Sequence, residues 1–219
     1  MILALDTSSA LTSVAVVDSA GLVVIERTHE DARRHAEVIG PMLAEVIAAV
    51  PRGDVTAVAC GVGPGPYTGL RVGIAAAIAV GAAWSIPVHG LCSLDALAAQ
   101  ALDERPGEPV DVGTDARRSE IYWASYSADG VRTDGPRVRP AVDVGPDVFR
   151  GMPSASWVGR RVRQLLGSGA VAPTEEIALD THGEDTGATA AALAGAGLLL
   201  PRPLYLRRPD AIVPVGVVS

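Results

Sequence analysis

The chain has 219 residues, of which 48% are hydrophobic and 20% charged, and its formal net charge is −7. This composition is typical of a folded protein with a sizeable core, and the acidic balance argues against a chain that holds nucleic acid by itself. All 18 basic residues are arginine, which excludes Schiff-base lysines and Walker-type lysines.

We expect neither a secretory signal peptide nor a membrane-spanning segment. The start, MILALDTSSA, lacks the basic region and cleavage site of a signal peptide. The longest apolar run, 74–84, is too short to span a bilayer. Two cysteines, Cys60 and Cys92, stand in apolar surroundings. We therefore expect a cytoplasmic protein with two buried thiols and no contact with a membrane.

The first half of the chain reads as a regular series of elements. Strands are predicted at 2–6, 13–18, 22–27, 55–62 and 86–90, and helices at 30–50, 69–84 and from 93 onwards, with Ser93 as the N-cap of the last. The order is β-β-β-α-β-α-β-α. This order is that of ribonuclease-H-like repeats, so we expect an α/β protein of the two-lobed actin/Hsp70-like class.

The second half is a reduced copy of the first. A charged, Pro/Gly-rich stretch at 103–109 predicts a boundary between lobes at 1–105 and 106–219. The stretch after it reads as strand, carboxylate turn and strand, with Asp115 in the place of Asp6. Further predictions are a strand at 131–140, a strand near 155–159, helices at 160–166 and 185–200, and an extended or irregular tail.

The segment GVGPGPYTG at 61–69 contains four glycines and two prolines. Three of the glycines permit unusual backbone angles, and Thr68 is the predicted N-cap of the following helix. Two interpretations remain open. The amides at the helix start bind an anion, or the glycines only allow a sharp turn into a packed helix. The spacing favours the second interpretation, because the segment matches neither the GxxxxGK(S/T) nor the GxGxxG phosphate-binding pattern. The motif residues are Gly63, Pro64, Gly65, Thr68, Gly69 and Arg71.

The helix predicted at 69–84 has almost no polar face, and small residues recur along it every four positions. Such a stripe lets another helix approach closely, whereas a surface helix normally has one apolar face. The helix is therefore internal or forms a subunit interface together with the helix before it, and we favour the interface. Gly73→Arg is then expected to abolish pairing and leave the fold intact. The expected contacts are Ile39, Leu43, Val46, Leu70, Gly73, Ile74, Ala77, Ile78 and Gly81.

Candidate ligand-binding residues follow the first strand, where Asp6, Thr7, Ser8 and Ser9 form a hydroxyl-rich turn. A nucleotide held between this turn and the arginines of the matching turn, DARRSE at 115–120, is one interpretation. The other is a hairpin whose hydroxyls satisfy their own backbone. His35 has no histidine one turn away, so we expect it to face solvent or cap a helix, and we predict no metal site.

Four segments resemble the bacterial TsaB (YeaZ) family, a subunit of the tRNA threonylcarbamoyladenosine machinery. They are LALDTSSALTSVAVV, GVGPGPYTGLRVGIAAA, DARRSEIY and PLYLRRPDA, and together they extend over nearly the whole chain. The glycine-proline motif is specific to the family. Pro66 departs from the Ser or Ala that is usual at its position, and the tail from Ala211 to Ser219 runs past the usual ending of the family.

The resemblance implies a two-lobed fold and a subunit without catalytic residues. The related catalytic subunit, TsaD, has a metal-binding histidine pair, and Gly90 and Leu94 stand at the matching positions here. The implied partners are a TsaD-type subunit, paired through helices 32–50 and 69–84, and a TsaE-type ATPase, with a homodimer when the chain is alone. The complex transfers threonylcarbamoyl to N6 of adenosine 37, so tRNA is reached only through it. We therefore expect this chain alone to bind no cofactor, and ATP or ADP to bind only in the assembled complex.

Two other functions remain open. An autonomous ATP-dependent kinase or phosphatase of the same superfamily would bind Mg-nucleotide tightly, and the substitution Asp6→Ala would weaken this binding. A plain homodimeric binding protein would ignore TsaD altogether. Co-purification with TsaD separates these interpretations from the scaffold hypothesis.

Overall fold

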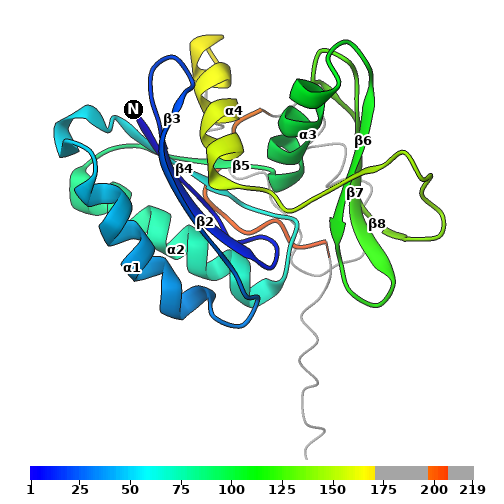
Figure 1. The fold of residues 1–219 in the computed structure, drawn as a ribbon, viewed down its shortest axis with the longest axis horizontal. Helices are drawn as coiled ribbons and strands as arrows, with labels where there is room; N and C mark the ends of the chain where they lie inside the picture. The colour runs from blue at the N-terminus through cyan, green and yellow to red at the C-terminus, as the bar shows by residue number, and fades with distance from the viewer. Residues whose placement is uncertain (171–196, 207–219) are drawn as a thin grey trace, which may run out of the picture.

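The computed structural model describes residues 1–170 and 197–206 (Figure 1). Two sheets with their covering helices account for nearly all of these residues. The elements are β1 (Ile2–Asp6), β2 (Leu11–Val17), β3 (Val23–Glu30), α1 (His35–Ala48), the short 3₁₀ helix η1 (Arg52–Asp54), β4 (Ala57–Gly61), α2 (Tyr67–Trp84), β5 (Val88–Leu91), α3 (Ser93–Glu104), β6 (Val110–Asp115), β7 (Glu120–Tyr126), β8 (Arg132–Pro140), β9 (Phe149–Arg150) and α4 (Ala155–Gly167).

The first sheet has the order β3-β2-β1-β4-β5. The first three strands form an antiparallel meander, and β4 pairs in parallel with both β1 and β5. The three successive strands predicted at the start of the chain and the strand predicted at 55–62 are thus confirmed. Every residue of β1 and β4 is buried, as expected for central strands covered on both faces.

Helices cover both faces of this sheet (Figure 1). Successive side chains of a strand point to opposite faces. In β1, Leu3 and Leu5 therefore share a core with residues of α1 and α2, whereas Ile2 and Ala4 share a second core with residues of α4. Because α4 lies on the face away from α1 and α2, it leaves the outer side of α2 uncovered.

Helix α4 replaces a strand that the sequence predicted near 155–159, and that prediction is wrong. The predicted helix at 160–166 is part of the same element, which begins five positions earlier. Ala155, Val158, Gly159 and Val162 are buried at helical spacing, and this periodicity overrides the strand preference of Trp157 and Val158. The packing partner on the first sheet, invisible in the local sequence, supplies the burial.

The second sheet has the order β8-β7-β6-β9 and packs against α3. Its first three strands confirm the predicted strand, carboxylate turn and two further strands. The division into lobes at 1–105 and 106–219 stays a prediction. The helix predicted at 185–200 and the tail lie mostly outside the described residues. The described segment 197–206 runs back along the first lobe, where Leu199 bridges Gly90 and the Leu204 amide donates to the Val62 carbonyl.

Three local predictions need correction. Helix α2 begins at Tyr67 after an extended Pro66, so Thr68 lies in its first turn and is not the N-cap. Ser93 is the first residue of α3 and not its cap. His35 is 5% exposed, and its Nδ1 is 2.7 Å from the Thr12 hydroxyl. For Ser93 and His35, hydrogen bonds to distant residues position the side chain, since the Ser93 hydroxyl donates to Asp6 and His35 pairs with Thr12.

Candidate functional site

A cleft of about 440 Å³ separates the two sheets at the ends of β1 and β6. From the first lobe it is lined by the β1–β2 turn, Ala32 and Pro66. From the second lobe it is lined by the β6–β7 turn and by Arg150 and Met152. The residues that line it are Ser9, Ala10, Ala32, Pro66, Gly113, Thr114, Asp115, Arg117, Ser119, Glu120, Ile121, Ala141, Arg150, Gly151 and Met152.

Of the four candidate residues in the β1–β2 turn, only Ser9 lines this cleft. Asp6, Thr7 and Ser8 are at most 1% exposed. The Asp6 carboxylate accepts hydrogen bonds from the Ser8 amide, the Ser8 hydroxyl and the Ser93 hydroxyl, at 2.8, 2.7 and 2.8 Å. These bonds favour the charged form, but complete burial outweighs them and raises the pKa of Asp6 to about 6.

Thr7 is also committed to the fold. Its hydroxyl donates to the Gly69 carbonyl at 2.7 Å and accepts from the Gly73 amide at 3.1 Å. Hydrogen bonds within the chain therefore satisfy the polar groups of Asp6 and Thr7, and the hydroxyl-rich turn is explained without a ligand. This geometry supports the hairpin interpretation of the turn.

The β6–β7 turn of the second lobe repeats the aspartate-to-backbone hydrogen bond of the β1–β2 turn, but its aspartate is exposed and not buried. The Asp115 carboxylate accepts from the Arg117 amide, two residues on, as Asp6 does from Ser8. Arg117, Arg118 and Ser119 follow in the left-handed region, with φ of 60°, 55° and 60°. Such backbone costs about 1–3 kcal/mol per residue and clusters at functional sites. This turn brings Arg117 and Ser119 to the cleft. Arg118, the other arginine predicted beside a nucleotide, is not among the described residues that line it, and Arg150, which lines it, was not predicted.

The glycine loop connects β4 to α2 and packs onto the first turn. Gly63 has a positive φ of 104°, as expected for a glycine-specific turn. Gly65 is needed for a different reason, because a Cβ there would lie 2.2 Å from the Ser8 carbonyl oxygen. Ser8 and its neighbours thus occupy the space beside the loop. The structure supports the packing interpretation of this motif.

Arg71, the last motif residue, belongs to an aromatic cluster that the sequence did not reveal. Its guanidinium lies 3.9 Å from the centre of the Tyr67 ring, and its Nε donates to the Tyr205 hydroxyl at 3.0 Å. The rings of Tyr67 and Tyr205 stack with centroids 4.6 Å apart. Tyr205 in the PLYL segment at 203–206 therefore contacts the start of α2, and Arg71 and Tyr205 are 134 positions apart in the chain.

The small-residue stripe of α2 faces its own sheet, which corrects the predicted orientation. A Cβ on Gly73 would lie 2.3 Å from the Thr7 hydroxyl oxygen, and one on Gly81 would lie 2.2 Å from Val88 Cγ2. Ala77 between them is fully buried. The close partners of the stripe are thus the turn after β1 and strand β5 of the same chain, and not a second helix. Seven of the nine predicted contact residues are buried in the chain: Ile39, Val46, Leu70, Gly73, Ile74, Ala77 and Gly81.

The other side of α2 presents a different apolar surface. Ala75, Ile78, Ala79 and Ala82 are exposed at helical spacing, and we call them the α2 outer strip. Ile78 is 45% exposed and is the large side chain of the strip. Of the nine predicted contacts, Ile78 and the half-buried Leu43 remain accessible. The neighbouring α1 adds exposed Pro41, Ala44 and Ala48.

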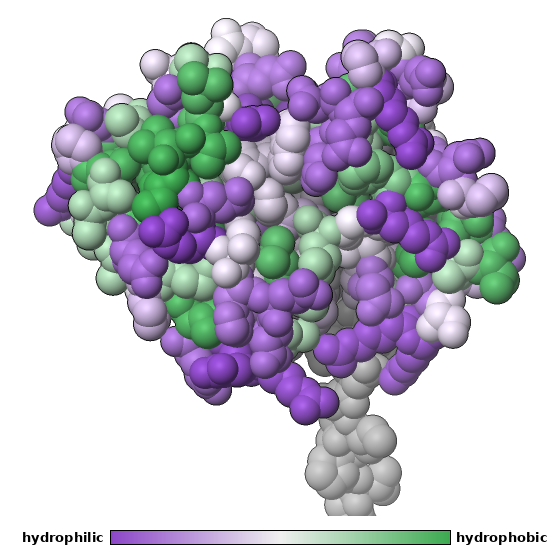
Figure 2. All heavy atoms as spheres, in the orientation of Figure 1, coloured by the Kyte–Doolittle hydropathy of each residue, from purple (hydrophilic) through white to green (hydrophobic). Residues whose placement is uncertain are grey.

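A second apolar area covers the β2–β3 hairpin, visible as the green region at the upper left of Figure 2. Leu22, Val23 and Val24 are 63%, 36% and 46% exposed, and β3 is an edge strand of the first sheet. Exposed apolar edge strands can pair with other chains. This area therefore competes with the α2 outer strip as a contact surface.

Two further properties concern metals and membranes. Within residues 1–170 and 197–206, no group of three or more His, Cys, Asp or Glu side chains is placed to hold a metal ion. In the same residues, α2 is one helix that is long and apolar enough to cross a membrane by length and composition alone. Helices of protein cores pass the same test, and the buried side of α2 packs on β1 and β4.

Comparisons with known proteins give consistent matches. The family model described as TsaD, tRNA N6-adenosine threonylcarbamoyltransferase, matches residues 23–148. An uncharacterised protein of Mycobacterium tuberculosis is 41% identical over 213 residues, which cover 96% of this chain and 93% of the relative. The tRNA threonylcarbamoyladenosine biosynthesis protein TsaB of Haemophilus influenzae is 38% identical over 140 residues, 61% of this chain and 56% of TsaB. The structure of YeaZ from Pseudomonas aeruginosa aligns with a TM-score of 0.67 at 26% identity, covering 77% of this chain and 92% of YeaZ.

The two sheets, with a cleft between their aspartate-led turns, define an α/β protein of the actin/Hsp70-like class. This result confirms the predicted fold class. The chain belongs to the threonylcarbamoyltransferase-related family that the matching model describes, and within it to the TsaB (YeaZ) group. It aligns with little more than half the length of the Haemophilus TsaB that it matches.

Proposed function

We propose that this chain is a non-catalytic scaffold subunit in the synthesis of threonylcarbamoyladenosine in tRNA. It pairs with a TsaD-type catalytic subunit in the cytoplasm, and the assembled complex, with a TsaE-type ATPase, modifies N6 of adenosine 37. This chain contacts tRNA only through the complex. Family membership and the naming of the TsaB relatives support the pathway. The environment of Gly90 supports the absence of a catalytic role.

The observation that carries the proposal is the occupied space beside Gly90. The family resemblance places the first metal-binding histidine of the catalytic subunit at this position. Here a Cβ on Gly90 would lie 2.4 Å from the Leu200 carbonyl oxygen and 2.8 Å from Val62 Cγ1. Leu94, at the second histidine position, is fully buried. The returning C-terminal segment therefore fills the volume that a histidine side chain would need.

The α2 outer strip is the surface best suited to pairing. Its alanines allow a second helix to approach closely, and residues 72–84 of α2 contain no charge. Ile78 supplies the large side chain that a contact of this kind needs at its centre. In the absence of a TsaD-type partner, we expect the same strip to pair with a second copy of this chain.

Nucleotide binding belongs to the complex in this proposal. Ser9 is the one polar side chain that the β1–β2 turn offers to the cleft, because Asp6, Thr7 and Ser8 are buried and internally bonded. Arg117 and Arg150 provide charge from one side of the cleft. We therefore expect Mg-ATP and Mg-ADP to give no heat of binding with this chain alone in calorimetry. Tight binding sensitive to Asp6→Ala would instead support an autonomous ATP-dependent enzyme.

The pairing test compares two single substitutions in apolar surface residues. Ile78→Arg places a charge on the α2 outer strip, and Val24→Arg is a matched control at the β3 edge, since the two side chains are 45% and 46% exposed. Each variant is mixed with the TsaD-type subunit of the same organism and analysed by size-exclusion chromatography with light scattering. Ile78→Arg should lose the heterodimer, and Val24→Arg should retain it.

The reverse pattern would move the interface to the β3 edge, and retention by both variants would contradict pairing through either surface. Failure of the unmodified chain to bind TsaD would contradict the scaffold role itself. Gly73→Arg is unsuitable for this purpose, because its side chain would collide with Thr7 and perturb the monomer.

A further inference from the structure

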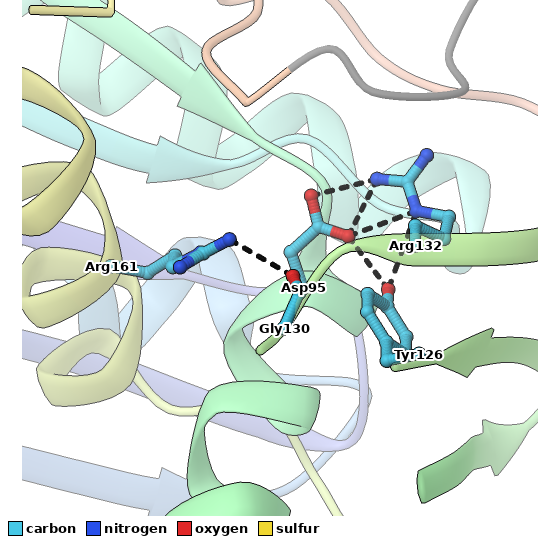
Figure 3. Close-up of polar contacts among 5 residues, drawn as sticks. All are labelled: Asp95, Tyr126, Gly130, Arg132 and Arg161. Carbon is cyan, nitrogen blue, oxygen red and sulfur yellow. Dashed lines mark hydrogen bonds and ion pairs between the residues drawn. The ribbon is translucent and has the colours of Figure 1, made fainter. Parts of the chain in front are cut away.

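A buried ion-pair cluster ties the start of α3, which follows the first sheet, to the β7–β8 hairpin of the second sheet (Figure 3). It consists of Asp95, Tyr126 and Arg132, which are 8%, 2% and 8% exposed, and we call it the interlobe cluster. The Arg132 guanidinium donates to both carboxylate oxygens of Asp95, with Nη2 2.7 Å from Oδ2 and Nε 3.0 Å from Oδ1. The Tyr126 hydroxyl donates to Asp95 Oδ1 at 2.6 Å.

The three side chains come from different parts of the fold. Asp95 lies in the first turn of α3, directly after β5 of the first sheet. Tyr126 ends β7, and Arg132 begins β8. A second bond reaches the same hairpin from α4, where Arg161 Nη2 donates to the Gly130 carbonyl at 3.0 Å. The β7–β8 hairpin of the second sheet is thus tied to α3 and also to α4, a helix packed on the first sheet.

The opposite ends of the same strands border the cleft. Strand β7 runs from Glu120 at the cleft to Tyr126 in the cluster, and β8 runs back from Arg132 to a point next to Ala141 at the cleft. Seven residues of strand span roughly 20 Å. A rotation of about 10° at the cluster would therefore move the cleft end by about 3–4 Å.

We propose that the interlobe cluster is a lock that fixes the angle of the second sheet and so sets the width of the cleft. The guanidinium donates three hydrogen bonds to the carboxylate, and the tyrosine hydroxyl bonds to both groups, so the cluster specifies orientation as well as contact. Apolar packing between α3 and the sheet can replace the stability of a buried ion pair, but it specifies direction less strictly.

The test replaces both charges together, because removal of one would leave the other buried without a partner. The variant is D95L/R132M. The control is Arg137→Met, which removes an exposed ion pair with Asp134 from the same strand. Spin labels are attached to cysteines introduced by Ala32→Cys and Arg150→Cys, on opposite sides of the cleft. The distance between them, measured by pulsed electron paramagnetic resonance, reports the cleft width. The native Cys60 and Cys92 are fully buried, so the labels attach to the introduced thiols.

In D95L/R132M the distribution of distances between the two labels should shift its centre, or increase its width, by about 3 Å. This is the displacement expected at the end of a strand of about 20 Å after a small rotation. Arg137→Met should leave the distribution unchanged. A distribution in D95L/R132M as narrow and centred as in the parent would overturn the proposal. Circular dichroism verifies the fold of each variant. If D95L/R132M does not fold, Tyr126→Phe decides, because it removes the hydroxyl's bonds to Asp95 and Arg132 and leaves both charges paired with each other. A broadened distance distribution supports the lock, and an unchanged distribution refutes it.

Discussion

The substitution Asp6→Asn tests whether ionisation of the buried Asp6 carboxyl group, at the start of the β1–β2 turn, destabilises the fold. Asp6 is 1% exposed, and burial raises its pKa from 3.8 to about 6 even though three hydrogen bonds stabilise the carboxylate. Asparagine preserves the shape of the side chain and cannot ionise. The variant therefore isolates the free energy associated with burying this one charge.

The magnitude follows from the pKa difference between the folded and unfolded states. A rise of about 2 units corresponds to about 3 kcal/mol, since one unit is worth about 1.4 kcal/mol. Because the folded-state pKa is the higher one, the contribution of Asp6 to stability is fully present below about pH 4 and is lost as the pH rises through 6. Between pH 4.5 and 7.5, the stability of the parent minus that of the variant should fall by about 2 kcal/mol.

Urea denaturation of both proteins at several pH values measures this difference, and the titration of all other groups cancels in the subtraction. With an m-value of about 2–3 kcal/mol per M, the relative midpoint shifts by roughly 0.7–1 M. Ser93→Ala, which removes one donor to the carboxylate, should move the transition to higher pH. A difference that stays constant over this range, or rises with pH, would refute the argument.

Three other measurements test the packing. Gly73→Ala should destabilise the fold by about 1–3 kcal/mol through overpacking, because its Cβ would lie 2.3 Å from the Thr7 hydroxyl oxygen; an unchanged urea midpoint would disprove this contact. Tyr205→Ala should lose about 1–2 kcal/mol from ring stacking and one hydrogen bond, while Tyr205→Phe should keep the stacking part. Burial raises the thiol pKa of Cys60 and Cys92 to about 12, so neither should react with Ellman's reagent at pH 8 until the protein unfolds; a thiol titrating in the native state would contradict their burial.

The sequence by itself determined the order of elements in the first lobe and the echo of that order in the second. These features can be predicted because they depend on patterns among residues close together in the sequence. Leu3 and Leu5 alternate with Ile2 and Ala4 because both faces of β1 are covered, and the glycine loop marks the turn from a buried strand into a helix. The family motifs were equally local, and the matching family model agrees with them.

Only the tertiary structure decided which face of each element is used. Periodicity shows that Gly73 and Ala77 share a side of α2, but the burial of that side under Thr7 and Val88 depends on residues far away in the chain. The same holds for α4, for the enclosed His35 and for the ion pair between Asp95 and Arg132. A local pattern fixes the spacing of side chains along an element, whereas the partner that covers them is set by packing across the whole fold.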